Sequence, residues 1–208
     1  MPHILLFAAA AFVLAVTPGP GMFYVVGRTW AAGRRDGLAS SLGTMLGGLV
    51  HVAACVVGVS ALVMASATAF SALKLVGGIY LIYLGIQTFR AASRQTPAMP
   101  DETAKDGAMR AFRQGVVVEA TNPKTAAFFL AFIPQFIMLG EGHVALQFLV
   151  LGVISVLLNT GADLVAVMGA AKLHARLVHR PSLFRRLRQG SGVMMASLGI
   201  GLLAARRA

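Results

Sequence analysis

The chain has 208 residues, of which 57% are hydrophobic and only 12% are charged, and its mean hydropathy is +0.77. A composition this apolar excludes an ordinary soluble domain and predicts a membrane protein. The formal net charge of +11 does not indicate a nucleic-acid partner, because the basic residues flank apolar runs and are not interleaved with aromatic residues. The single cysteine, Cys55, lies inside an apolar run, which excludes an intramolecular disulfide and favours a packed thiol.

Six apolar stretches are candidates for helices that cross a hydrocarbon core of about 30 Å. The third is short unless the lysine at its start, Lys74, reaches out to the interface, and the sixth is the shortest. No Lys or Arg precedes the first stretch, so the basic segment of a signal peptide is missing and we expect this span to be retained. The stretches cover residues 4–27, 38–64, 73–89, 115–139, 144–171 and 192–205.

The distribution of basic residues predicts how these spans are oriented. Fourteen of the 18 Lys and Arg residues follow spans one, three and five, three fall on the opposite side, and Lys124 lies within a span. The positive-inside rule places the richer side in the cytoplasm. Both termini are then expected on the outer, periplasmic side of the membrane.

The long polar segment at 90–113 divides the spans into two groups of three. An odd number of spans in each half means that any structural repeat between the halves is inverted. We therefore expect an all-α membrane protein of six transmembrane helices, arranged as two inverted three-helix repeats with a broken first helix in each half. It forms a single membrane domain, 1–208, with one repeat at 1–90, a cytoplasmic loop at 91–113 and the second repeat at 114–208.

The two breaks are "TPGPG" at 17–21 in the first span and "TNPKT" at 121–125 in the fourth. At about 1.5 Å per helical residue, their prolines lie about 15 Å from the arginines at the cytoplasmic ends of the spans, near the middle of the bilayer. A proline lacks an N–H and disrupts the bond to the carbonyl four residues earlier. This leaves the carbonyls of Leu14, Val16 and Glu119 without a helical partner.

Irregular backbone at this depth is tolerated only where it is buried in protein or lines a water-filled cavity. Paired interrupted helices therefore indicate the binding site of a transporter. A proline kink that only shapes the helix is the simpler alternative. The residues of the two breaks that we predict to form the site are Pro18, Gly19, Pro20, Gly21, Asn122, Pro123 and Lys124.

Three charged residues, Glu119, Lys124 and Asp163, lie within predicted spans, where each costs about 2.5–3.5 kcal/mol at the helix centre. Lys124 follows Pro123 at the start of a half-helix, so that positive potential and free N–H groups meet at one point, which suits a substrate carboxylate. The alternative is that Lys124 forms a structural ion pair with Glu119 or Asp163.

Asp163 follows Asn159 by four residues on the same helical face, and the two side chains are within reach of a hydrogen bond. An intramembrane carboxylate can bind a substrate amine or carry a proton, or it can serve only to neutralise Lys124. His51 in the second span can join Glu119 and Asp163 in a proton relay, although a lone histidine in a membrane span is more typical of a packing residue.

Four segments together carry a family resemblance: "TPGPGMFYVVGRTWAAGRRDGLASSLGTMLGGLVH", "LKLVGGIYLIYLGIQTFR", "NPKTAAFFLAFIPQF" and "RLRQGSGVMMASLGIGLLA". With them, essentially the whole chain resembles the LysE/RhtB family of amino-acid exporters. The resemblance implies a six-helix carrier of the bacterial inner membrane that exports lysine, homoserine, threonine or related compounds with the energy of the proton gradient.

The family motifs match this chain directly at the two breaks. The first proline-glycine motif falls on Pro18, Gly19 and Pro20, and the second on 122–124. Relatives often have a neutral polar residue, commonly asparagine, where this chain has Glu119. This additional acid can attract a cationic substrate or carry a proton, so the substrate cannot be copied from any relative.

The sequence therefore predicts a proton-coupled exporter whose partners are an amino acid, protons and the lipid bilayer. It predicts no cofactor and no metal, and it is compatible with a homo-oligomer. A passive channel for small polar solutes is the alternative, because the same broken helices could line a pore. An enzyme that uses Glu119 or Asp163 is not supported, because the chain has no HExxH, GxSxG or CxxC motif. A helical accessory subunit would leave the charges in the membrane unexplained.

Overall fold

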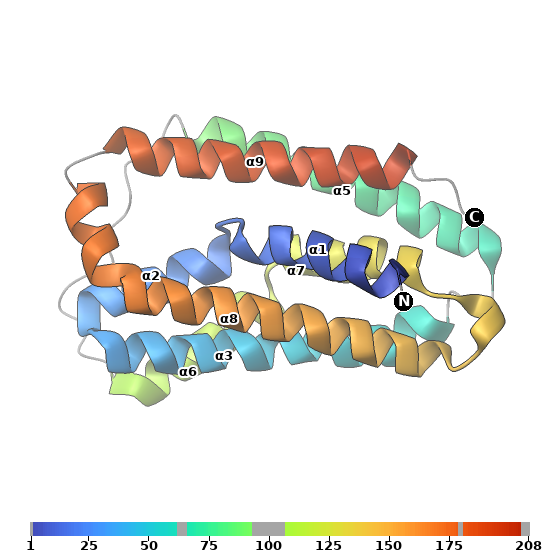
Figure 1. The fold of residues 1–208 in the computed structure, drawn as a ribbon, viewed down its shortest axis with the longest axis horizontal. Helices are drawn as coiled ribbons and strands as arrows, with labels where there is room; N and C mark the ends of the chain where they lie inside the picture. The colour runs from blue at the N-terminus through green and yellow to red at the C-terminus, as the bar shows by residue number, and fades with distance from the viewer. Residues whose placement is uncertain (1, 62–65, 93–106, 179–180, 205–208) are drawn as a thin grey trace.

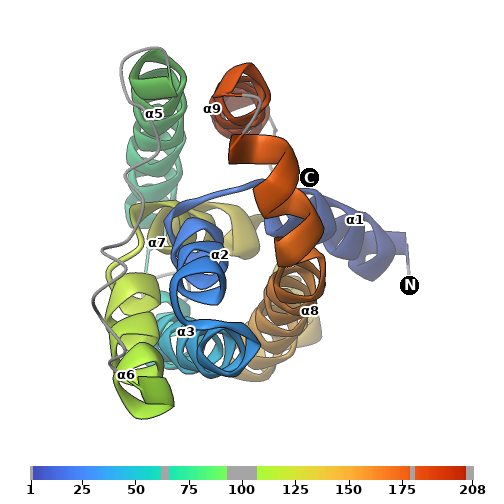
Figure 2. The ribbon, with the colours of Figure 1, turned by 90° about the vertical axis from the view of Figure 1, so that its left-hand side faces the viewer.

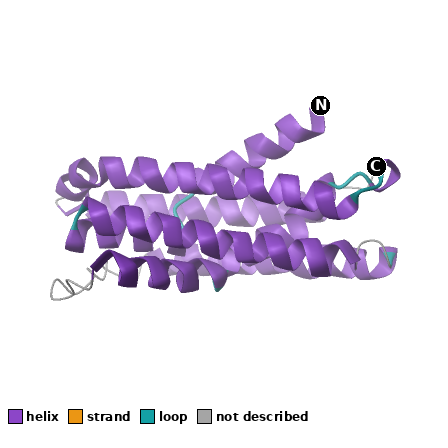
Figure 3. Cartoon of the chain, turned by 90° about the horizontal axis from the view of Figure 1, so that it is seen from below, coloured by secondary structure: helices purple, strands orange, loops and turns teal. Residues whose placement is uncertain are grey.

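The computed structural model describes residues 2–61, 66–92, 107–178 and 181–204, and every element within these ranges is helical (Figures 1 and 3). Two short segments are π-helical, η1 (Cys55–Val59) and η2 (Phe128–Phe132), and two are 3-10 helices, η3 (Ile133–Phe136) and η4 (Leu139–Glu141). The α-helices are α1 (Pro2–Val16), α2 (Pro20–Ala32), α3 (Arg34–Ala54), α5 (Ala67–Ala92), α6 (Gly107–Ala120), α7 (Pro123–Ala127), α8 (Val144–Val178) and α9 (Pro181–Ala204).

The helices run along the long axis of the molecule in three tiers (Figures 1 and 2). The pair α5 and α9 forms the upper tier, and α3, α6 and α8 form the lower one. The half-helices α1, α2 and α7 lie between these tiers, with α2 and α7 near the axis in the end-on view of Figure 2, whereas α6, the half-helix before the second break, belongs to the lower tier. The two breaks themselves are buried, with Thr17 3% and Asn122 4% exposed, as is expected of a transport site.

Three helical segments of the described residues are long and apolar enough to cross a membrane, and five are if each bent pair counts as one span. The sixth predicted span falls in α9, which does not pass this test. Its first half carries Arg185, Arg186 and Arg188, so that its apolar part is short. The arrangement of six spans in inverted repeats is thus not confirmed, whereas an all-α membrane protein is.

The two ends of the bundle differ in charge. α1 begins and α9 ends at one end, and the connections from α2 to α3 and from α8 to α9 lie at the other (Figure 1). Two of the arginines predicted to be cytoplasmic lie at this second end, Arg28 near the end of α2 and Arg34 at the start of α3. Residues 107–113, which were expected in the central loop, form the first turns of α6, and 93–106 lie outside the described residues.

Glycines allow two pairs of helices to approach closely. A Cβ atom added at Gly85 of α5 would lie 2.5 Å from the carbonyl oxygen of Gly192 in α9, and one at Gly43 of α3 would lie 2.1 Å from the carbonyl oxygen of Phe112 in α6. No side chain fits at such distances. Each seam therefore joins two helices of one tier by backbone contact, α5 with α9 in the upper tier and α3 with α6 in the lower tier.

Buried phenylalanines fill the bundle toward the end where α1 begins. Phe7, Phe128 and Phe148 are fully buried, and the rings of Phe7 and Phe136 meet edge to face at 5.2 Å between centroids. Cys55 is buried at the edge of this cluster and its thiol donates to the carbonyl oxygen of Phe129. The expected packed thiol is confirmed.

The seam between α5 and α9 can be tested with two glycines of one helix. Gly192→Ala places a methyl group against the α5 backbone and should destabilise the protein by about 1–3 kcal/mol, as overpacking does. Gly201→Ala on the same helix meets no atom within 4 Å and should be neutral or slightly stabilising, because alanine favours helix over glycine. Thermal unfolding of the purified variants in detergent measures both, and equal behaviour of the two would contradict the seam.

Candidate functional site

The two breaks contact each other directly. The axes of α1 and α2 bend by 46° at the first break, and the helices before and after the second bend by 42°. A Cβ atom at Gly19 would lie 3.0 Å from Cδ of Lys124, and one at Gly21 would lie 2.4 Å from Oε2 of Glu119. Glycine at these two positions thus lets the charged side chains of the second break lie against the backbone of the first.

Lys124 crosses from the second break to the end of α1. Its side chain is 5% exposed, and Nζ donates hydrogen bonds to the carbonyl oxygens of Leu14 at 2.9 Å and Thr17 at 2.7 Å. The carbonyl of Leu14, which was predicted to lack a helical partner, accepts from the backbone N–H of Thr17 at 3.2 Å as well as from Lys124. Thr17, which lies within the break, provides the second acceptor of Lys124 in place of Val16. A cation at this position also opposes the negative end of the α1 dipole.

Glu119 occupies the matching position at the start of α2. The residue is 2% exposed, and its two carboxylate oxygens accept hydrogen bonds from Asn122 Nδ2 at 2.9 Å and Thr125 Oγ1 at 2.6 Å. Its Oε2 lies against Gly21 in the first turn of α2, which has no side-chain cap. The negative charge therefore offsets the positive end of the α2 dipole.

Asn122 caps the half-helix that follows the second break. Its Oδ1 accepts a hydrogen bond from the backbone N–H of Lys124 at 3.1 Å. The expectation that the N–H groups at this point are free is therefore wrong for Lys124, because an asparagine directly before the helix satisfies the first of them.

The alternative in which Lys124 forms a structural ion pair is wrong. Within the described ranges, the only ion pair at 4.0 Å or less joins Arg28 and Asp36 at the basic end of the bundle, with N and O atoms 3.0 Å apart. Lys124 instead donates to backbone. Its ammonium has three N–H groups, of which two are used by the carbonyls of Leu14 and Thr17, so one remains for a ligand.

His51 lies beside the second break and not in an isolated core. Its Nε2 is 3.0 Å from the carbonyl oxygen of Glu119, and its ring lies 5.7 Å from that of Phe129 between centroids. This carbonyl, which was predicted to lack a helical partner, also accepts from the backbone N–H of Asn122 at 3.0 Å. The contact with this carbonyl gives His51 a structural role, and its part in a proton relay stays a prediction.

Asp163 is 1% exposed and accepts a hydrogen bond from Thr44 Oγ1 of α3 at 2.8 Å. The predicted bond between Asp163 and Asn159 is not formed, since Thr44 takes its place and the Asn159 amide lines a cavity instead. The helical spacing correctly placed both residues on one face of α8, but it could not determine where each side chain points.

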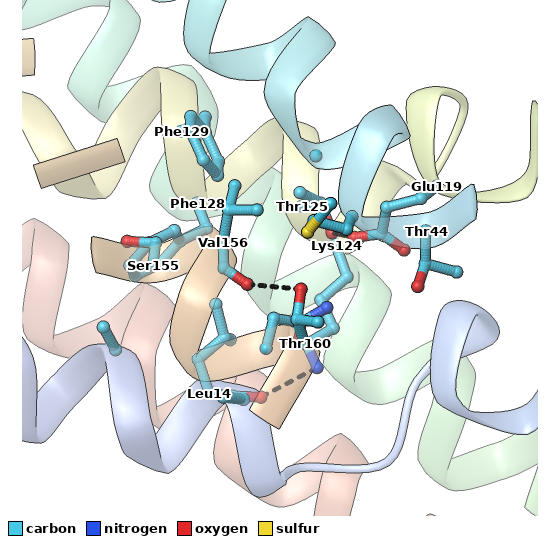
Figure 4. Close-up of a pocket in the computed structure, with 15 residues that line it drawn as sticks. Leu14, Thr44, Glu119, Lys124, Thr125, Phe128, Phe129, Ser155, Val156 and Thr160 are labelled. Atoms are coloured by element: carbon cyan, nitrogen blue, oxygen red, sulfur yellow. Dashed lines mark hydrogen bonds between the residues drawn. The ribbon is translucent and has the colours of Figure 1, made fainter. Parts of the chain in front are cut away.

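A small cavity lies where the breaks meet α3 and α8 (Figure 4). Figure 4 shows Lys124 bonded to the Leu14 carbonyl, with Thr160 beside it and the rings of Phe128 and Phe129 on another wall. The cavity holds about 30 Å³, which is room for water and not for an amino acid. Its lining residues are Ala11, Leu14, Ala15, Thr44, Met45, Gly48, Glu119, Lys124, Thr125, Phe128, Phe129, Ser155, Val156, Asn159 and Thr160.

The sequence reasoning missed the hydroxyl groups around this cavity. Thr44 and Thr125 bind the two buried carboxylates, and Ser155 and Thr160 line the wall on α8. A signal existed, because Ser155, Asn159 and Asp163 recur every four residues on one helical face. Tyr24 of α2 was also missed, although its hydroxyl donates to the carbonyl oxygen of Ala111 in α6 at 2.8 Å.

These features define an all-helical membrane protein whose two broken helices meet at a buried, charged centre. The chain belongs to the LysE type translocator family, which matches it over residues 12–206. It is therefore a transporter and not an enzyme, as the sequence predicted. No solved structure shows a significant match to the chain.

Several relatives are similar over nearly their whole length. The homoserine/homoserine lactone efflux protein of Salmonella typhimurium is 33% identical over 94% of this chain and 93% of its own. An uncharacterized membrane protein of Vibrio cholerae is 31% identical over 97% of this chain and 97% of its own. One of Pseudomonas aeruginosa is 30% identical over 90% of this chain and 88% of its own. The resemblance stated from the sequence is thus confirmed at the level of the family.

Contact between the breaks can be tested at Gly21. Gly21→Ala places a methyl group onto the Glu119 carboxylate and should lower stability by about 1–3 kcal/mol, because the acid must leave at least one of its donors. Gly161→Ala, in α8 with no atom within 4 Å, is the control. If thermal unfolding in detergent shows no difference between the two variants, the breaks do not pack as described.

Proposed function

We propose that this transporter exports small amino acids or their close derivatives across the bacterial inner membrane, with both termini in the periplasm, in exchange for protons. The similarity to an efflux protein named for homoserine and homoserine lactone supports this substrate class. The family description as a translocator supports transport itself. Homoserine, threonine and lysine are the substrates that the sequence suggests first.

One observation carries the proposal: Lys124 of the second break donates to the backbone of the first while lining a cavity. An ammonium with one N–H to spare, held in a site without bulk water, is a strong partner for a carboxylate. In the proposed mechanism the substrate carboxylate binds Lys124. One of the buried acids, Glu119 or Asp163, receives the amine or exchanges a proton.

The small size of the cavity supports a carrier over an open pore. A cavity of about 30 Å³ does not admit an amino acid, so binding requires the two halves to move apart. We propose that one three-helix repeat rocks against the other about the contact between the breaks, which exposes the site to each side in turn. A passive channel would instead need a continuous path.

Proton exchange supplies the energy for export. One charge moved through the membrane potential is worth about 2.3 kcal/mol per 100 mV, which is enough to bias the substrate distribution severalfold or more for each proton. Glu119, Asp163 and His51 are the titratable groups at or beside the site that can carry it.

Transport and the role of Lys124 can be tested together in liposomes that contain the purified protein. Vesicles preloaded with unlabelled homoserine, threonine or lysine should take up the same labelled amino acid by counterflow. Lys124→Met keeps the volume of the side chain and removes its N–H groups, so counterflow should fall by about tenfold or more. Lys74→Met, which removes a lysine of α5 away from the cavity, should retain it.

Each variant must first elute as a folded protein in detergent. Loss of Lys124 removes a hydrogen-bond donor of the Leu14 and Thr17 carbonyls, and it leaves the buried acid Glu119 without a nearby positive charge. Absence of counterflow by the intact wild type across a broad panel of amino acids would contradict the proposed function. Flux that is insensitive to preloading would favour the passive channel.

Coupling can be tested with a pH-sensitive dye inside the vesicles. Efflux of a preloaded amino acid should acidify the lumen, because a proton enters as each substrate leaves. The double variant Glu119→Gln with Asp163→Asn should show no such acidification, since both buried carboxylates are lost. Efflux by the wild type without any change in luminal pH would show that transport is not proton exchange.

A further inference from the structure

We infer that Asp163, and not Glu119, is the carboxylate that receives the amino group of the substrate, with Asn159 and Ser41 as its neighbours in the site. This inference rests on the proposed function and assigns the second half of its binding site. It makes Asp163 the residue by which the transporter distinguishes an amino acid from the corresponding carboxylic acid.

Both carboxylate oxygens of Glu119 already have a donor from within the second break. One oxygen accepts from Asn122 and the other from Thr125, and Oε2 also lies against Gly21. Binding a substrate amine there would require the acid to leave the contact that closes the two breaks on each other. Glu119 therefore joins the breaks and is a positioning residue.

Asp163 has capacity to spare. Its Oδ2 accepts from Thr44, and no donor among the residues that the structure describes reaches Oδ1. The residue is nevertheless 1% exposed. A buried carboxylate normally has several donors, and one that lacks them indicates a water, an ion or a ligand in the functional state.

Two neighbouring polar groups are unsatisfied as well. The hydroxyl of Ser41 is fully buried and has no hydrogen-bond partner within the described chain. Ser41 lies one turn before Thr44, on the face of α3 between Gly37, which packs on α2, and Gly48, which packs on α8. The Asn159 amide, one turn before Asp163, lines the cavity, likewise without a partner among the described residues.

Thr44 connects these groups to the cavity that Lys124 and Asn159 both line, because its hydroxyl contacts the carbonyl oxygen of Ser41 at 2.9 Å and the carboxylate of Asp163 at 2.8 Å. Thr44 lines the cavity together with Lys124 and donates to Asp163, and the charges of Lys124 and Asp163 act on each other electrostatically. An amino acid bound here has its carboxylate at Lys124 and its ammonium at Asp163. Hydrogen bonds from the ammonium to Asn159 and Ser41 then satisfy the remaining acceptors.

The test compares an amino acid with its deamino analogue as competitors of counterflow. For homoserine the analogue is 4-hydroxybutyrate, which keeps the carboxylate and the hydroxyl. We expect homoserine to compete at least tenfold better than 4-hydroxybutyrate with the wild type, and this ratio to fall close to one in Asp163→Asn. Glu119→Gln should keep this ratio even if its transport rate falls. Glu141 is an exposed acid outside the site, so Glu141→Gln should keep both the ratio and the transport rate.

A ratio that persists in Asp163→Asn, or that is lost in Glu119→Gln alone, overturns the assignment while transport by the wild type still supports the proposed function. If the wild type transports no amino acid, the proposed function fails first. For variants that fold but do not transport, the rise in unfolding temperature with each ligand gives the same ratio. If Asp163→Asn does not fold, Asn159→Ala tests the assignment instead. Its ratio of competition by homoserine over 4-hydroxybutyrate should fall if the site is as assigned, and an unchanged ratio overturns the assignment.

Discussion

The ammonium of Lys124 on the carbonyls of Leu14 and Thr17 is the interaction on which the interior of this bundle depends. A helix that breaks inside a membrane leaves backbone groups without partners, and hydrocarbon cannot satisfy them. Here the second break supplies what the first lacks. Lys124 lies at the negative end of α1 and Glu119 lies at the positive end of α2. Two opposite charges, five residues apart, thus stabilise the two half-helices that the prolines create, and each charge is partly neutralised by a helix end.

The polarity of the interior changes along the bundle axis at this contact. Toward the end where α1 begins, Phe7, Phe128 and Phe148 close the interior. Toward the basic end, buried polar residues follow one another from Asp163 and Thr44 to the pair of Asp36 and Arg28. An exporter takes up its cargo from the cytoplasm, so a polar inner half and an aromatic outer half are the arrangement that the proposed orientation requires.

The sequence predicted the interrupted helices because Pro and Gly act on the backbone locally, and it predicted the buried charges because charge in an apolar run is conspicuous. It could not determine the partners of those charges. Whether Lys124 meets an acid or a carbonyl depends on how α1 ends, and whether Asp163 meets Asn159 or Thr44 depends on the packing of α8 on α3. Both are tertiary contacts between residues more than 100 positions apart. Helical periodicity places a side chain on a face and does not choose its neighbour.

The assignment of Asp163 also gives a physical reason for exchange. A carboxylate binds an ammonium strongly only when it is ionised, so a proton on Asp163 and an amine at Asp163 exclude each other. The same residue can therefore bind the cargo on one side of the membrane and a proton on the opposite side. The cargo and the proton cannot cross together, because they compete for this carboxylate. Glu119 does not serve this purpose, because its donors Asn122 and Thr125 hold it within the contact that both states need. Under this assignment the second acid contacts both breaks and does not bind the amine, and the proton gradient sets the direction of net exchange.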